Sequence, residues 1–307
     1  MLIRSIVTFL AAAVLLPAST ATAVPDGKGF PTPLAAAQAL VRAAKSGDQT
    51  AIVNILGPSS RDLVTTHDPV QDQRIRQLFT ERAAEKMQLI PNPWQRNAMT
   101  LLVGNDGWPL PIPIVQVNGQ WYFNTAEGRN EILARRIGRN ELDAIQVSRG
   151  YVEAQQDYGE HHRNNMGSPI YAQRIISSPG KQDGLYWEGT VNGQESPIGK
   201  FIARAFAQGY TTRNEPYHGY YFKVLTAQGP HASGGAKNYV KDGEMTGGFA
   251  LIAWPSDYRS TGVMTFIVNR AGIVYQKDLG PDTARLAAAY SEYDPDDTWT
   301  PVSDATE

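Results

Sequence analysis

The serine residues of this sequence are candidates for nucleophilic chemistry. A serine hydrolase presents its nucleophile in a G-x-S-x-G turn between a strand and a helix, and this pentapeptide does not occur in the sequence. The nearest segment, His231-Ala232-Ser233-Gly234-Gly235, lacks the strand–turn–helix pattern around it. It is typical of a flexible loop that carries a histidine. We therefore predict no catalytic residue from this pattern.

Two short segments contain the ligand types of a metal site. Glu160, His161 and His162 are adjacent, and neighbouring side chains on a helix point about 100° apart, so they cannot chelate one ion from one face. At a helix C-terminus the two histidines instead interact favourably with the negative end of the helix dipole. The aspartates 294, 296 and 297 are interrupted by a proline and lack the glycine and glutamate of a calcium loop. We predict neither a metal nor a cofactor.

The composition excludes further chemistry. The chain has no cysteine, which rules out thiol catalysis, iron–sulfur clusters and thiolate zinc sites. The segment SSPGKQDG has a Gly-Lys pair but lacks the first glycine and the following Ser or Thr of a phosphate-binding loop. A net charge of −2 gives no indication of a basic surface that binds nucleic acid. The sequence also has no polybasic segment that would bind an anionic membrane surface.

Aromatic residues form the most distinctive cluster. Its members, which stand beside a glycine-rich loop or across the expected sheet from it, are Tyr217, His218, Tyr220, Tyr221, Trp254 and Tyr258. Tyrosine and tryptophan are favoured in ligand clefts and interfaces, whereas alternating aromatics in a strand mostly pack in a core. Core packing is the default interpretation, and a binding surface is the alternative.

A second candidate binding element begins at Trp108. Prolines 109, 111 and 113 alternate in WPLPIPIVQV, so every missing N–H falls on the same side of the chain. The pattern predicts an edge strand or an extended arm over 108–115. An edge of this kind could accept a strand from another protein.

The elements that must position these residues follow from local signals. Thr32 and Asp48 are N-cap residues of two short helices joined by Ser46-Gly47-Asp48, which predicts a helical hairpin. A third helix is expected from about Val70 to Met87, with four side chains directed inward: Ile75, Leu78, Phe79 and Ala83. A strand at AMTLLVG and a hairpin with an Asn118-Gly119 turn then predict a small antiparallel sheet.

The second half is predicted to be a long helix packed on a sheet. Residues 127–158 carry a continuous apolar stripe at helical spacing. A long irregular stretch follows, with a short helix expected over 197–207. The strands HGYYFKVLTA, FALIAWP, VMTFIVN and IVYQKDLG then predict an antiparallel meander, of which FALIAWP has both faces covered. The fold class is therefore α+β.

The N-terminus has the three parts of a secretory signal: Arg4, an apolar run from Ser5 to Leu16, and small residues that end at Ala23. The apolar run is shorter than the ~20 residues that cross a membrane, so we predict cleavage after Ala23 and no lasting anchor. The organisation expected is a signal peptide over 1–23, an α+β domain over 24–126, a helix-plus-sheet domain over 127–290 and an acidic tail over 291–307.

Three resemblances add to this interpretation. NELDAIQVSRGYVEAQQDY followed by TFIVNRAGIVYQKDLG resembles the soluble head of type IV pilin-like proteins. The helical hairpin with NGQWYF more weakly resembles the cone-shaped fold of nuclear-transport-factor-like proteins. Phrases such as VGNDGWPLPIPIV, EILARRIGRNEL and GGFALIAWP are similar, along most of the chain, to a family of exported bacterial proteins known as domain of unknown function 2950. That resemblance implies export but no activity.

The function expected is that of a non-enzymatic, exported binding protein. Its location is predicted to be the periplasm or the medium, and its partner another envelope protein or a second copy of the chain. The alternative is a hydrolase of unrecognised type that acts on envelope material. A pocket where His218 or His161 meets a carboxylate within hydrogen-bond distance would favour the hydrolase.

Overall fold

The computed structural model describes residues 25–303 apart from 192, 200–204 and 206–214. The helices are α1 Pro33–Ser46, α2 Gln49–Leu56, α3 Arg61–Val64, α4 Pro69–Glu85, α5 Thr125–His161 and α7 Thr283–Ala289, with a short 3-10 helix, η1, at Pro58–Ser60. The longer strands are β1 Met87–Pro91, β2 Ala98–Val103, β4 Ile114–Val117, β5 Gln120–Phe123, β6 Tyr220–Leu225, β11 Ala250–Pro255, β12 Met264–Asn269 and β13 Tyr275–Asp278. The two-residue strands are β3 Trp108–Pro109, β7 Ala227–Gln228, β8 Lys237–Asn238, β9 Val240–Lys241, β10 Glu244–Met245, β14 Glu292–Tyr293 and β15 Thr300–Pro301.

The N-terminal helical hairpin forms where its caps predict. The Thr32 Oγ1 accepts a hydrogen bond from the Ala35 N–H at 3.1 Å, and Asp48 Oδ1 accepts one from the Ala51 N–H at 2.9 Å. Each bond satisfies an N–H group that has no partner inside its helix. Gly47 ends α1 between the two caps. This prediction is confirmed.

The first sheet has the strand order β1-β2-β4-β5, and β3 also pairs with β2. The turn between β4 and β5 uses Asn118 and Gly119 with φ of 50° and 78°, as this hairpin type requires. The segment 108–115 is not one edge strand, because β4 lies between β2 and β5 and cannot accept a further strand. Ile112 and Ile114 are buried. The free energy of burying their side chains outweighs the restriction that the neighbouring prolines place on the backbone.

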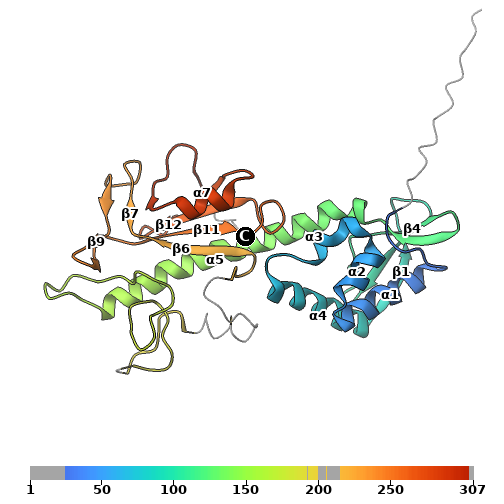
Figure 1. Ribbon diagram of the computed structural model, residues 1–307, viewed down its shortest axis with the longest axis horizontal. Coiled ribbons are helices and arrows are strands. Elements are labelled where there is room, and N and C mark those ends of the chain that lie inside the picture. The colour runs from blue at the N-terminus through green and yellow to red at the C-terminus, as the bar shows by residue number, and fades with distance from the viewer. Residues whose placement is uncertain (1–24, 192, 200–204, 206–214, 304–307) are drawn as a thin grey trace, which may run out of the picture.

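A single helix, α5, joins the two halves of the molecule (Figure 1). Its 37 residues correspond to about 55 Å at 1.5 Å per residue. Its first turns pack on the N-terminal core through Ile132, and the stretch from Ala144 to Tyr158 packs in the C-terminal core. The helix therefore belongs to both halves.

The C-terminal sheet has the order β15-β13-β12-β11-β6, with every neighbouring pair antiparallel. Figure 1 shows α5 and α7 on opposite faces of this sheet. The interior strand β11 is buried on both sides, as its near-continuous apolar sequence predicts. The α+β fold and the packing of the long helix on the meander are confirmed.

The end of the chain is not a separate acidic tail. Strand β14 pairs with β7, and β15 pairs with the edge strand β13. Tyr293 and Trp299 are buried in the C-terminal core. The free energy gained by burying these aromatic rings outweighs the preference of the segment's acidic side chains for water. The short helix expected over 197–207 lies for the most part outside the described residues.

Buried polar contacts connect the two cores near the middle of α5. Gln71 Nε2 donates to Asn140 Oδ1 at 3.1 Å, and Asn140 Nδ2 donates to the Thr261 carbonyl at 2.9 Å. The Gly219 N–H donates to Asp68 Oδ2 at 3.0 Å. We call these five residues the junction. Its bonds tie α4 and the loops of the C-terminal sheet to one helix.

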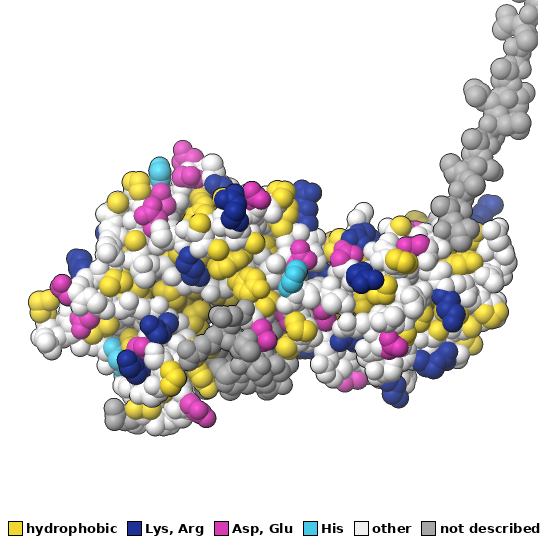
Figure 2. Space-filling model, viewed as in Figure 1, with side chains coloured by type: hydrophobic (Ala, Val, Ile, Leu, Met, Phe, Trp, Pro, Cys, Tyr) yellow, Lys and Arg dark blue, Asp and Glu magenta, His cyan; other side chains and the backbone are white. Residues whose placement is uncertain are grey.

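The surface drawn in Figure 2 mixes basic and acidic side chains over both halves. Within the described ranges, no helix combines the length and the apolar character needed to cross a membrane.

Candidate functional site

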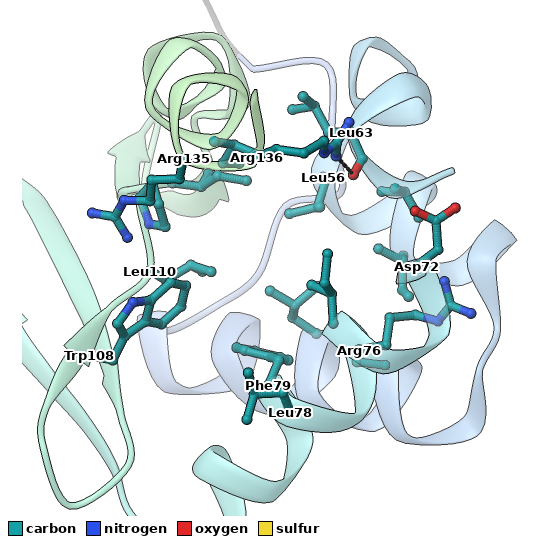
Figure 3. A pocket seen from close by; sticks show the side chains of 18 of the residues that line it. Leu56, Leu63, Asp72, Arg76, Leu78, Phe79, Trp108, Leu110, Arg135 and Arg136 are labelled. Atoms are coloured by element: carbon teal, nitrogen blue, oxygen red, sulfur yellow. Dashed lines mark hydrogen bonds between the residues drawn. The ribbon is translucent and has the colours of Figure 1, made fainter. Parts of the chain in front are cut away.

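A pocket with a volume of about 470 Å³ lies between α4 and α5 in the N-terminal half (Figure 3). Helices α1, α2 and α3 and the segment from Trp108 to Ile112 complete its wall. The volume is in the range of sites for small organic ligands, about 300–1,000 Å³. The large apolar side chains that line it include Ile75, Leu78, Phe79, Trp108, Leu110 and Ile132.

Two of these residues correct the expectation for α4. Ile75 and Leu78, predicted to point into a core, are 37% and 48% exposed. They lie on the face of α4 that borders the pocket. Exposed large apolar side chains gathered around a concavity are typical of a binding site.

Charged groups accompany the apolar wall. Five arginines line the pocket, Arg76, Arg82, Arg135, Arg136 and Arg139, together with one carboxylate, that of Asp72.

Arg136 and Asp72 are the buried members of this set. Arg136 donates to the carbonyls of Asp62 and Leu63 at 3.1 and 2.6 Å, which anchors α3 to α5. Burial lowers the pKa of Arg136, and the negative charge of Asp72 opposes that effect. Burial raises the pKa of Asp72, whose carboxylate accepts hydrogen bonds from the N–H and hydroxyl of Thr66. Both side chains therefore have a structural role.

Two further arginines are paired at the surface. Arg82 forms an ion pair with Asp106 at 2.8 Å. Arg135 pairs with Glu131 at 2.6 Å, and its guanidinium lies 5.4 Å from the centre of the Trp108 ring. The paired charges hold the Trp108 side of the wall in place.

Arg76 and Arg139 have fewer partners. The Arg76 Nη1 is buried and has no hydrogen-bond partner among the described residues. Arg139 is exposed on α5 and makes no hydrogen bond, ion pair or ring contact within the described part of the chain. The charge of Arg76 is attracted to the Asp72 carboxylate, but its Nη1 and the Arg139 guanidinium have no hydrogen-bonded acceptor among the described residues.

The aromatic residues singled out in the sequence do not form one surface. Tyr220 is fully buried, and its hydroxyl donates to the Met264 carbonyl at 2.9 Å, so it is a core residue. Tyr221 lies opposite Trp254 in the β6–β11 ladder, with ring centres 5.7 Å apart. Tyr258 donates to Asp278 at 3.1 Å. Trp108 lies in the other half of the molecule, in the pocket wall.

Tyr217 and His218 lie next to the junction. Their rings stack with centres 4.1 Å apart. The His218 Nδ1 is 2.8 Å from Asp143 Oδ2 on α5, and both side chains are mostly buried. His218 also has a φ of 50°, which is uncommon for a residue other than glycine. A histidine held by a carboxylate is an arrangement used for proton transfer.

The other histidines have local roles. His161 and His162 use Nδ1 to contact the carbonyls of Asp157 and Tyr158 at 2.9 Å, at the C-terminal end of α5 as expected. His231 contacts Asp294 Oδ2 at 2.8 Å in an exposed position. Over the described residues, no group of three or more His, Asp or Glu side chains is arranged to hold a metal ion.

The sequence patterns did not predict a role for the arginines of the pocket. The spacing of Ile132, Arg135, Arg136 and Arg139 places them along α5 over two turns, which was the available signal. Their approach to α4 is a long-range contact that spacing does not reveal.

The geometry defines an α+β protein with an arginine-bordered apolar pocket at one end of a shared helix. The family model "Protein of unknown function (DUF2950)" matches residues 27–302, so the chain belongs to this family. No curated protein and no solved structure matches the chain. The resemblances to pilin heads and to the nuclear-transport-factor-like fold stay predictions from the sequence.

Proposed function

We propose that this chain is an exported binding protein, that its site is the pocket between α4 and α5, and that it binds a small apolar molecule there without transforming it. The observation that carries the proposal is the exposure of Ile75 and Leu78 toward a pocket of about 470 Å³. Burying such side chains under a ligand recovers about 25 cal/mol for each Å² of apolar surface removed from water.

Export is the second part of the proposal. It is supported by the signal-like segment 1–23 and by the resemblance to exported bacterial proteins. The occupant is then a component of the cell envelope or of the medium. Association with an envelope protein or with a second copy of the chain is the other form of binding that we propose.

Binding of the neutral fluorescent probe N-phenylnaphthylamine tests the pocket. We expect saturable binding to the mature protein and its loss in Leu78→Asp, which places a charge in the wall. Leu142→Asp is the matched control, because Leu142 is also exposed on a helix but does not line the pocket. Absence of probe binding, or equal effects of both substitutions, would contradict the proposal.

A hydrolase is the second candidate, and the contact of 2.8 Å between His218 and Asp143 favours it. Asp143 would orient the imidazole for proton transfer to or from a bound substrate. The test is turnover of chromogenic ester, phosphate and glycoside substrates by the wild type and by His218→Ala. Turnover that disappears in the variant supports the hydrolase, and no turnover, or equal turnover, excludes it.

A further inference from the structure

We infer that the pocket binds a single-chain anionic amphiphile with a carboxylate head, which is the chemistry of a fatty acid. This inference rests on the proposed function, because it names the ligand class of the same pocket. It follows from how the charges and the apolar side chains are distributed along the cavity.

The available positive charge lies at the junction end of the pocket. The bond between Gln71 and Asn140 brings the first turns of α4 next to the middle of α5. Arg76 is five residues after Gln71 on α4, and Arg139 precedes Asn140 on α5. Both arginines line the pocket. The head of a ligand placed here meets Arg139 and the Nη1 of Arg76, which has no hydrogen-bond partner among the described residues.

The opposite end of the pocket is apolar and its charges are neutralised. Figure 3 shows Trp108 across the cavity from Asp72 and Arg76. At the Trp108 end, Arg82 is paired with Asp106, and Arg135 with Glu131. Ile75, Leu78 and Phe79 lie on α4 along the same cavity. An elongated apolar body with one charged end matches this layout.

The sign and size of the ligand charge follow from the same residues. A cationic head would be repelled by Arg76 and Arg139, and a neutral head would leave the buried Arg76 Nη1 without an acceptor. A carboxylate matches the guanidinium fork. A doubly charged phosphate monoester would add repulsion with Asp72, which lies in the same wall. A monoanionic carboxylate is therefore the best fit.

Displacement of N-phenylnaphthylamine by C12 compounds below their micellar concentrations tests the inference. Near pH 8, where a carboxylate is ionised, we expect dodecanoate to displace the probe at a concentration about tenfold lower than dodecanol, the difference of one charge-assisted hydrogen bond. Dodecyltrimethylammonium and dodecyl phosphate should be weaker competitors than dodecanoate.

Three variants locate the head group. Arg76→Gln should weaken dodecanoate binding about tenfold, and the exposed Arg139→Gln about threefold, with dodecanol unchanged. Arg74→Gln is the matched control, an exposed arginine on α4 that does not line the pocket, and it should have no effect.

The outcomes separate the two proposals. If the probe does not bind, the proposed function itself fails. If the probe binds but dodecanol competes as well as dodecanoate, or Arg76→Gln behaves like Arg74→Gln, the pocket is an apolar site and the anion inference is overturned. Tighter competition by dodecyl phosphate would also overturn the choice of a carboxylate.

Discussion

Replacing Asn140 with alanine tests the contacts that join the two halves of the molecule. Asn140 is fully buried, accepts a hydrogen bond from Gln71 at 3.1 Å and donates one to the Thr261 carbonyl at 2.9 Å. Alanine can do neither, so two buried polar groups lose their partner. Each orphaned group costs about 1–3 kcal/mol, and the expected loss is therefore about 2–6 kcal/mol in the free energy of unfolding.

The assay is urea unfolding followed by circular dichroism and tryptophan fluorescence, with the loss read from the shift of the midpoint. Gln146→Ala is the control, since Gln146 is exposed on the same helix and its replacement should change stability by no more than about 0.5 kcal/mol. A midpoint for Asn140→Ala that equals the control would refute the view that this buried pair of bonds holds the halves together.

Three further predictions concern other parts of the chain. Gly219→Ala should lower the melting temperature through a cost of about 1–3 kcal/mol, because φ is 76° and the added Cβ would lie 2.6 Å from Asn140 Nδ2; an unchanged melting temperature would contradict this. The hydrogen bond with Asp294 raises the pKa of His231, so the stabilisation from this pair is complete below the unfolded value of about 6.5 and is lost as the pH rises through the folded pKa. NMR titration should show His231 titrating at a lower pH in Asp294→Asn, and identical curves would be evidence against the bond. Mass spectrometry of the protein exported by a bacterial host should find Val24 as the first residue, and a retained leader would exclude cleavage after Ala23.

Elements defined by neighbouring residues were predictable. The caps at Thr32 and Asp48 act over three residues, and the Asn118-Gly119 turn over two, so the chain close to them contains the whole signal. The unbroken helix α5 and the meander were also found, because apolar periodicity extends along each element. The prediction of a separate acidic tail was wrong because the strands that pair with this segment, β7 and β13, lie elsewhere in the sequence.

The candidate site was not predictable in the same way. Ile75 and Leu78 have the spacing of a core-facing stripe, and that spacing is identical whether another element covers the face or leaves it open. Arg76 and Arg139 are far apart in the chain and line the same pocket only because α4 packs beside α5. The contact of His218 with Asp143 spans 75 positions.

By itself the sequence determined the α+β class, the order of most of the longer helices and strands, and the signal-like leader, since each depends on local propensity, capping or a run of composition. Only the tertiary structure decided which apolar faces are buried, which charges are paired and where a pocket remains. These properties depend on distances between residues remote in sequence, and such distances are set by the packing of whole elements.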